Sequence, residues 1–173
     1  MTYLRETKAL VLTLEADDLR MMRWYVDASF AVHNDMKGHT GAGMTMGKGS
    51  IYNKSTKQKI NAKSSTEAEL IGVDDILPQV LWSNYFVRAQ GWSHQTTIFQ
   101  DNKSAILLEN NGRLSSSGRT KHINVRYYFI KDVISRNEAS IKYLGTNEMW
   151  SDLYTKPLQG KKFISFRKTI MNL

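Results

Sequence analysis

The stretch YVDASF, residues 25–30, places one acidic residue inside a run that otherwise favours a buried β-strand. Tyr, Val and Phe are typical of strands, and Trp24 extends the run backwards, so we predict a strand that leads into the polar loop 34–38. Asp27 would lie within this strand or at its end. A carboxylate there must be hydrogen-bonded, paired or bound to metal, because burying it bare costs several kcal/mol or more. For one isolated acid a loop cap or an ion-pair partner is the simpler interpretation. Only matching acids elsewhere in the chain could favour a functional role for Asp27.

The composition is that of one globular domain with a basic surface. Of 173 residues, 41% are hydrophobic and 23% charged, which is enough for a layered core. Twenty-four basic residues against sixteen acidic ones leave a net charge of +8, which favours nucleic acid as partner over an anionic membrane surface. No segment approaches the roughly 18 apolar residues of a membrane span, and no signal peptide is evident, so we expect a soluble protein that is not secreted. The absence of cysteine excludes disulfides and thiolate ligands, and leaves oxygen or imidazole ligands for any metal.

Two further strands are predicted after the first. Residues 40–46 are small and apolar, and the turn 47–49 leads into residues 50–53, a pattern typical of a β-hairpin. The basic stretch 54–63 either continues the third strand or forms a solvated edge, and its charge also suits a phosphate backbone. Residues 1–22 carry mixed signals and are predicted to be an annex to the core.

A helix is predicted to begin at SSTEAEL, residues 64–70. Hydroxyl side chains precede acids at the spacing of a capping box, and apolar residues then recur on one helical face. Glu69 adjoins that apolar face and could point inward beside the sheet, whereas Glu67 is a first-turn acid favoured by the helix dipole. Pro78 either kinks this helix or begins a second one that closes at Gly91.

A fourth strand is predicted at residues 96–100, directly before Asp101 and Asn102, and a helix follows at 105–108. Because a helical crossover separates this strand from the first, the two can lie parallel and adjacent, with Asp27 and Asp101 on the same edge. Open α/β sheets bind their ligands at that edge.

The last third of the chain is more basic. A mobile loop is predicted at 110–120, a helix at 122–137, a strand at 140–144 and a basic helix at 161–173, with Asp152 near the start of a short helix between the last two. The aromatic residues of the first helix are more typical of core than of base stacking, but its cations and those of the loop suit phosphates. These cations are Arg113, Arg119, Lys121, Arg126, Lys131 and Arg136.

The acids form a set in this predicted arrangement: Asp27, Glu69, Asp101 and Asp152. Four convergent carboxylates repel one another unless divalent cations neutralise them. Oxygen-only sites with open positions suit Mg²⁺ or Mn²⁺, and two such ions about 4 Å apart can activate a water and stabilise the leaving oxygen in phosphodiester hydrolysis. The four acids together therefore favour a metal site over a purely structural role for Asp27.

In five blocks the chain resembles the ribonuclease H domain of reverse transcriptases, most closely that of copia-type LTR retrotransposons. The blocks are YVDASF, SSTEAEL, QDNKSAI, RTKHINVRYYFI and SDLYTKPL, in order between about residues 27 and 158. The resemblance implies an α/β, ribonuclease H-like fold, with a five-stranded mixed sheet of strand order 3-2-1-4-5 flanked by helices. It also implies hydrolysis of the RNA strand of RNA–DNA hybrids by a two-metal mechanism. Residues 1–22 would be the tail of the connection region or an N-terminal extension, and residues 23–173 the ribonuclease H domain.

Carried over residue by residue, the family's catalytic and metal-binding acids fall on Asp27, Glu69, Asp101 and Asp152. Glu69 is preferred to Glu67 because it directly precedes Leu70, as in the family's Glu-Leu pair. Residues 64–66 match positions that contact the minor groove of the hybrid in related enzymes, where 2′-hydroxyls distinguish RNA from DNA. The predicted substrate-binding residues are Ser64, Ser65, Thr66, Asn102, Arg119, Lys121 and Arg126.

One departure from the family concerns histidine. Cellular and retroviral relatives carry a His-containing loop between the last strand and the final aspartate, but only residues 145–151 fill that gap here, and they contain no histidine. His122 precedes a helix on the other side of the last strand, where a structural or substrate-backbone role is favoured over catalysis. If that loop assists proton transfer or product release, this protein should be slower or should rely on water and metal alone.

The leading hypothesis is an endoribonuclease that acts on RNA–DNA hybrids with two Mg²⁺ ions, or Mn²⁺ in their place. It would work within, or be cut from, a retroelement polyprotein, beside its polymerase and connection domain, in a cytoplasmic virus-like particle and without a membrane partner. The alternative is a catalytically silent hybrid-binding module that keeps the fold for architecture in a reverse transcriptase. A third hypothesis is a ribonuclease H-like nuclease that acts on DNA.

Overall fold

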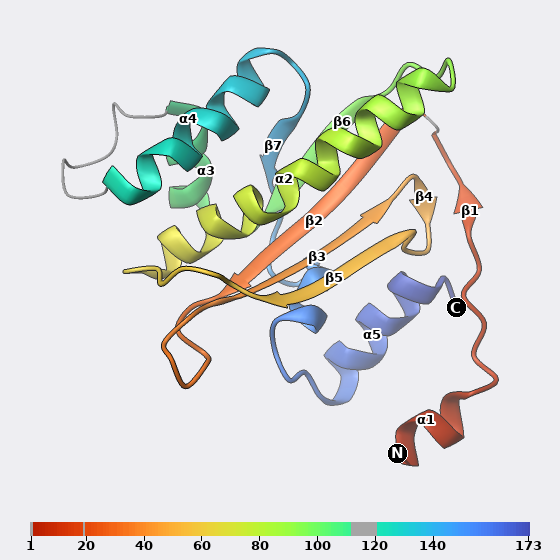
Figure 1. Cartoon of the computed structure of the whole chain (residues 1–173). Helices are drawn as coiled ribbons and strands as arrows, with labels where there is room; N and C mark the ends of the chain where they lie inside the picture. Colours follow the sequence, from red (N-terminus) through yellow and green to blue (C-terminus); the bar gives the residue numbers. More distant parts are fainter. Residues whose placement is uncertain (1, 19, 112–120) are drawn as a thin grey trace.

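The computed structural model of the chain describes residues 2–18, 20–111 and 121–173, and the side chains of 121–124 lie outside that description. A five-stranded mixed sheet runs through the molecule with helices on both faces (Figure 1). Its strands are β2 (Met21–Ser29), β3 (His39–Thr45), β5 (Tyr52–Lys57), β6 (Gln95–Gln100) and β7 (Ser140–Tyr143). The helices are α1 (Thr2–Thr7), α2 (Ser65–Ala89), α3 (Lys103–Asn111), α4 (Lys121–Ser135), the 3₁₀ helix η2 (Trp150–Tyr154) and α5 (Gly160–Met171).

The sheet has the strand order β5-β3-β2-β6-β7, which is 3-2-1-4-5 when its strands are counted along the chain, as predicted. β2 is antiparallel to β3, and β3 is antiparallel to β5, whereas β6 pairs in parallel with β2 on one side and with β7 on the other. β2 pairs with β6 up to Tyr25 opposite Phe99, so Asp27 and Asp101 both follow at the carboxyl edge of this parallel pair. The predicted crossover between these strands is α2.

β2 alternates between the two faces of the sheet. Met22, Trp24 and Val26 are buried in the main core, where they pack with apolar residues of α2 and α4. Tyr25 and Asp27 point to the opposite face, where the Tyr25 ring lies 4.6 Å from that of Trp150 in η2. The period-two pattern of a strand therefore sends its apolar residues to one layer and its acid to the other.

α2 begins as the capping pattern predicts and is longer than expected. The Ser64 hydroxyl accepts a hydrogen bond from the Glu67 backbone N–H at 3.2 Å, and the Glu67 carboxylate accepts one from the Lys63 N–H at 2.7 Å. The helix runs through Pro78 without a break into a second helix. Proline removes one backbone hydrogen bond, but the buried apolar face of α2 continues on both sides of it and holds the helix together.

Replacing Ser64 with alanine should lower the free energy of unfolding by about 1 kcal/mol, because the first turn of α2 loses its capping acceptor. Chemical denaturation followed by circular dichroism measures the change. Ser65→Ala is the matched control, since Ser65 is exposed and lies inside the helix. Equal stability of the two variants would contradict the capping role.

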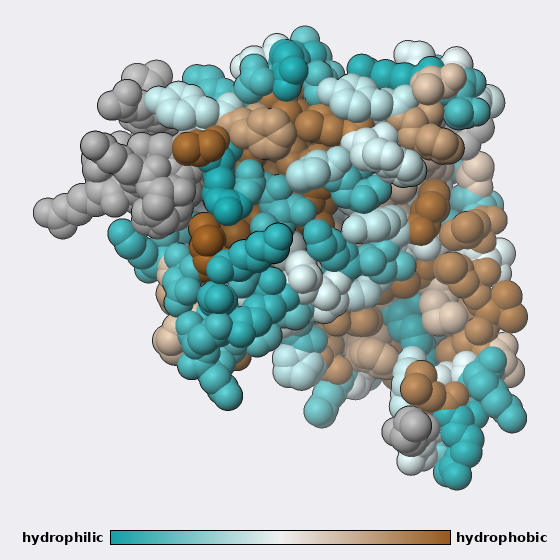
Figure 2. Space-filling view, in the orientation of Figure 1, coloured by the Kyte–Doolittle hydropathy of each residue, from teal (hydrophilic) through white to brown (hydrophobic). Residues whose placement is uncertain are grey.

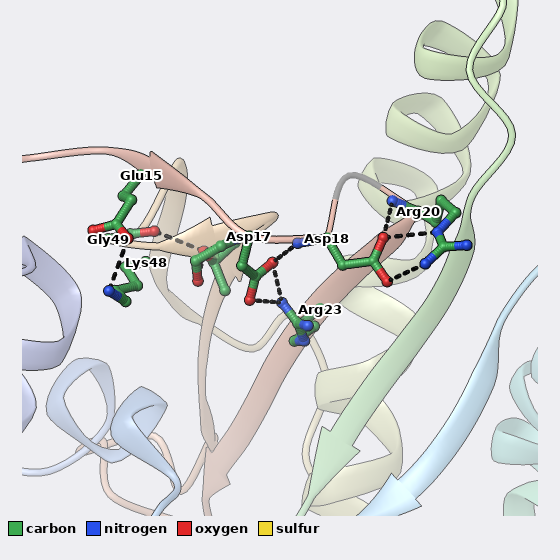
Figure 3. Close-up of polar contacts among 9 residues, drawn as sticks. Glu15, Asp17, Asp18, Arg20, Arg23, Lys48 and Gly49 are labelled. Atoms are coloured by element: carbon green, nitrogen blue, oxygen red, sulfur yellow. Dashed lines mark hydrogen bonds and ion pairs between the residues drawn. The ribbon is translucent and has the colours of Figure 1, made fainter.

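The N-terminal segment lies beside the turn of the β3–β5 hairpin and against α5. β1 (Glu15–Ala16) pairs with β4 (Gly47–Lys48), and Figure 3 shows the Glu15–Lys48 ion pair at 2.8 Å beside that of Asp17 and Arg23 at 3.0 Å. The Tyr3 ring packs edge-on against Phe163 of α5. Apolar side chains of the coil between α1 and β1 stay exposed at the right of Figure 2.

Two predictions concern the bounds of segments: a domain boundary near residue 22 and a loop at 110–120. The boundary predicted between residues 22 and 23 stays a prediction; β2 already begins at Met21. The loop predicted at 110–120 was placed too early, since α3 runs to Asn111, and from residue 112 on it lies outside the described residues. In the described part of the chain, none of the helices has the length and apolar character that crossing a membrane requires.

Candidate active site

Three of the four predicted acids meet at the carboxyl edge of the sheet. Asp27 lies on β2, Asp101 directly after β6 and Asp152 in η2, and one carboxylate oxygen from each lies within 4.8 Å of the other two. Asp27 and Asp152 are buried, with 1% and 0% exposure, and Asp101 is half-buried. The three side chains come from segments far apart in the chain, so the fold itself assembles the cluster.

Glu69 lies beside this cluster, in the second turn of α2. It is buried, and its Oε2 has no hydrogen-bond partner among the described residues. Burial, followed by repulsion from Asp27 and Asp101, holds the pKa of Glu69 well above its usual value. The fourth predicted acid thus interacts electrostatically with Asp27 and Asp101, although it is not among the three whose oxygens converge.

Hydroxyl groups fix the orientation of two of the acids. The Thr155 hydroxyl donates to Oδ2 of Asp27, and the Ser29 hydroxyl donates to the Thr155 carbonyl oxygen at 3.0 Å. The Thr146 hydroxyl donates to Oδ2 of Asp101 at 2.8 Å. Burial raises the pKa of Asp27, against the opposing effects of Lys156 and of the Thr155 hydrogen bond.

Two lysines reach the same carboxylates. Lys156 Nζ lies 2.6 Å from Oδ1 of Asp152 and 3.3 Å from Oδ1 of Asp27. Lys162 Nζ, from α5, lies 2.7 Å from Oδ2 of Asp152. Burial alone would lower the pKa of Lys156, but attraction to Asp27 and the hydrogen bond to Asp152 raise it overall.

The donors present fit a divalent cation. Carboxylate oxygens are the ligands that hard cations prefer, and of the three convergent acids Asp101 is the one that is only partly buried. The unpaired Oε2 of Glu69 is a second observation, since buried polar atoms normally have a partner. Asp27, Asp101 and Asp152 could therefore hold a metal ion, and the charge of Glu69 interacts with those of Asp27 and Asp101.

Two glycines on β3 allow η2 to lie against the sheet. Gly41 is opposite Asp27 in the ladder, and a Cβ there would lie 2.6 Å from Cγ2 of Thr155. A Cβ on Gly43 would overlap the ring of Trp150. Because η2 carries Asp152, these positions set how closely that acid approaches Asp27.

Gly43→Val should lower the free energy of unfolding by about 1–3 kcal/mol, since the added side chain must displace the buried Trp150 ring. Denaturation followed by tryptophan fluorescence reports both the stability and the ring's surroundings. Gly145→Ala is the control, because nothing lies within 4 Å of a Cβ at that position. A Gly43→Val variant as stable as the control would show that η2 does not need the close approach.

Two plant retrotransposon proteins are similar to the chain in sequence. No family model matches the chain. It is 32% identical over 165 residues, 94% of its length, to the retrovirus-related Pol polyprotein from transposon TNT 1-94 of Nicotiana tabacum. It is 30% identical over 173 residues, 98% of its length, to that from transposon RE2 of Arabidopsis thaliana. The chain spans 12% of the length of each of these relatives.

Solved structures show the fold. LC11-RNase H1, isolated from compost by a metagenomic approach, has a TM-score of 0.59 at 9% identity, over 78% of this chain and 92% of that one. The chain has the ribonuclease H fold. LC11-RNase H1 in complex with an RNA/DNA hybrid gives a TM-score of 0.53 at 10% identity, over 74% and 88%. The N-terminal RNase H domain of a Mycobacterium tuberculosis protein gives 0.51 at 10%, over 86% and 96%. The predicted fold class and the resemblance to retrotransposon proteins are confirmed.

The predicted substrate-binding residues have different surroundings in this ribonuclease H fold. Ser64 and Ser65 are exposed and Thr66 is half-buried, all at the start of α2, one turn from Glu69. The Asn102 side chain accepts a hydrogen bond from the Ala105 N–H at 3.0 Å and so caps α3. Their contact with substrate stays a prediction.

The predicted basic contacts lie partly outside the description. Arg119 and the side chain of Lys121 are not among the described residues, and the same holds for the side chain of His122. Arg126 forms an ion pair with Asp74 of α2, so its charge is paired within the protein in this structure. Its role towards substrate also stays a prediction.

Thr155, Lys156 and Lys162 carry no role in the sequence prediction, although each touches a predicted acid. Two of them belong to the block SDLYTKPL, and Lys156 follows Asp152 by four residues, the spacing that brings two side chains together on one helical face. That spacing was an available signal for Lys156. Lys162 carried no comparable signal, because only the packing of α5 brings it to the site.

Proposed function

We propose that this chain is a metal-dependent endonuclease that hydrolyses the RNA strand of RNA–DNA hybrids. The observation that carries the proposal is the convergence of carboxylate oxygens from Asp27, Asp101 and Asp152 beside the unpaired oxygen of Glu69. In a ribonuclease H fold with a net charge of +8, such a cluster suits phosphodiester cleavage in a polyanionic substrate.

The proposed cofactor is a pair of Mg²⁺ ions, with Mn²⁺ as a substitute, held by Asp27, Glu69, Asp101 and Asp152. When bound, such ions supply an activated water and stabilise the charge that develops on the phosphate and the leaving oxygen. The chain's own residues orient the ligands. Thr155 fixes the carboxylate of Asp27 and Thr146 that of Asp101, so that ligand oxygens are held before substrate arrives.

Selectivity for RNA is assigned to the start of α2. The Ser64 and Ser65 side chains are exposed there, within one turn of Glu69, and a helix N-terminus adds donors for a phosphate. Hydroxyl and amide side chains at such a position can pair with a 2′-hydroxyl, which only the RNA strand offers. One related structure, that of LC11-RNase H1, is described as a complex with an RNA/DNA hybrid, which supports this substrate class.

The proposed setting is a retroelement polyprotein. Both relatives reported above are Pol polyproteins of which this chain matches 12%, so we propose the reverse transcriptase polymerase and connection region as its partner in the same polyprotein. The hybrid would then be the product of reverse transcription.

A second candidate function is a silent hybrid-binding module. It is favoured by Lys156 and Lys162, which occupy oxygens of Asp27 and Asp152, and by the lack of histidine in residues 145–151. The complete set of four acids favours the enzyme.

The deciding experiment offers the chain an end-labelled RNA–DNA hybrid with Mg²⁺, and duplex DNA and duplex RNA of the same sequence in parallel. We expect cleavage of the RNA strand of the hybrid only, and none in EDTA or in an Asp101→Asn variant. Hybrid that is bound but left intact would favour the silent module. Cleaved duplex DNA would favour the third hypothesis.

A further inference from the structure

Both carboxylate oxygens of Asp152 are engaged by ammonium groups. Lys156 Nζ lies 2.6 Å from Oδ1 and Lys162 Nζ lies 2.7 Å from Oδ2, while Lys156 also reaches Oδ1 of Asp27 at 3.3 Å. Asp152 and Asp27 are almost fully buried, so these contacts are desolvated on the side of the acids. A carboxylate oxygen that accepts from an ammonium at such a distance cannot take a metal in the same direction.

The two lysines are held at the site by different parts of the fold. Lys156 follows η2, and its backbone N–H donates to the Asp152 carbonyl oxygen at 2.9 Å. Lys162 comes from α5, where its Nζ also lies 5.1 Å from the centre of the Phe166 ring. The two side chains are 38% and 36% exposed, so both lysines lie at the surface of the protein although the acids they contact are buried.

We propose that Lys156 and Lys162 are built-in counter-cations that compete with divalent metal for Asp27 and Asp152. The inference rests on the metal site of the proposed function. Without metal, the two ammonium groups compensate the clustered acids and keep Asp152 in place. Metal binding requires both groups to swing out towards solvent, where they become free to meet the phosphates of a bound strand.

The proposal has two consequences that differ from those of an ordinary surface ion pair. Removal of either ammonium should strengthen metal binding, since the metal no longer has to displace it. The same removal should weaken the metal-free fold, since buried carboxylates lose their partner. An ordinary supporting residue would change both quantities in the same direction.

Calorimetric titration of the full chain with Mg²⁺, after dialysis against EDTA and then metal-free buffer, measures the first consequence. For Lys156→Met and for Lys162→Met we expect the dissociation constant to fall about tenfold, the ratio that corresponds to one charge-assisted hydrogen bond. In EDTA the melting temperature of each variant should fall by several degrees. Lys161→Met is the matched control, because Lys161 is exposed on the same helix and forms no ion pair among the described residues.

A measurement on the unaltered chain does not depend on how the variants fold. Amine-directed labelling followed by mass spectrometry, with and without Mg²⁺, should show a several-fold rise in the reactivity of Lys156 and Lys162 when metal is added, and no change at Lys161. Unchanged reactivity together with unchanged or weaker Mg²⁺ binding in the variants would overturn the proposal, as would a failure of every variant to bind Mg²⁺. Tighter binding in a chain that does not cleave hybrid would support the lysine competition while refuting the proposed enzyme. Cleavage of hybrid by the chain, with no change in the Mg²⁺ affinity of the variants, would support the proposed enzyme and refute the lysine competition.

Discussion

If the proposed function is right, replacing Asp27 with asparagine is expected to lower the rate of hybrid cleavage by about 10³-fold or more, because the proposed metal site loses the charge of one of its three convergent carboxylates. The amide keeps the shape of the side chain and can still accept the hydrogen bond from Thr155, so the variant should remain folded. Single-turnover cleavage of labelled hybrid in Mg²⁺ gives the rate, and circular dichroism gives the fold.

Asp132→Asn is the matched control for this loss of charge. Asp132 lies on α4, and its side chain is 58% exposed in an ion pair with Arg136. The control should cleave at the rate of the unaltered chain. An Asp27→Asn variant that kept a tenth of that rate would refute the metal-binding role assigned to Asp27.

Glu109→Gln is expected to stabilise the protein, and increasingly so as the pH rises from about 5 to 8. Glu109 of α3 is 0% exposed, neither of its carboxyl oxygens has a partner among the described residues, and burial raises its pKa from 4.5 to about 8. Because the folded state holds the proton more tightly than the unfolded state, this group favours folding below pH 4.5, and its contribution is lost as the pH rises through 8.

The expected difference at pH 7 is on the order of 3 kcal/mol, and it should vanish near pH 4.5. Urea denaturation at a series of pH values measures it as the difference between the variant and the unaltered chain, which cancels the titration of all other groups. Glu6→Gln is the control, since Glu6 is exposed in α1. A difference that does not vary with pH would show that Glu109 titrates normally.

The sheet and its acids were largely predictable from the sequence because their signals are local. Asp27 stands out from the strand around it, and the cap at Ser64 marks the start of the helix that carries Glu69. The parallel placement of the first and fourth strands then follows from the helical connection between them. Those three facts are enough to bring Asp27 and Asp101 to one edge, as the structure has them.

The residues that surround the acids were not predictable in the same way. Lys162 reaches Asp152 only because α5 packs against η2, and nothing in its own neighbourhood in the chain marks that contact. The ion pair of Arg126 with Asp74 likewise depends on the packing of α4 on α2, and the charge of Arg126 alone does not predict it. Long-range packing decides both cases, and residue type does not carry that information.

The proline of α2 shows a limit of a different kind. Pro78 permits two outcomes, a kinked helix or a break, and the local pattern does not choose between them. The chain continues as one helix because residues on both sides of Pro78, such as Ile76 and Val80, are buried in the same core. A tertiary contact again decides what the local signal leaves open.

The two glycines of β3 affect how related chains should be compared. At Gly41 and Gly43 the site depends on two methyl groups that are missing, not on any group that is present. A copy of this chain could keep all four acids and still lose the proposed activity through one alanine or valine at either position, because the added side chain would displace η2. A survey that sorts active from decayed copies by their carboxylates alone would misclassify such a chain, whereas one that also reads the two positions on β3 would not.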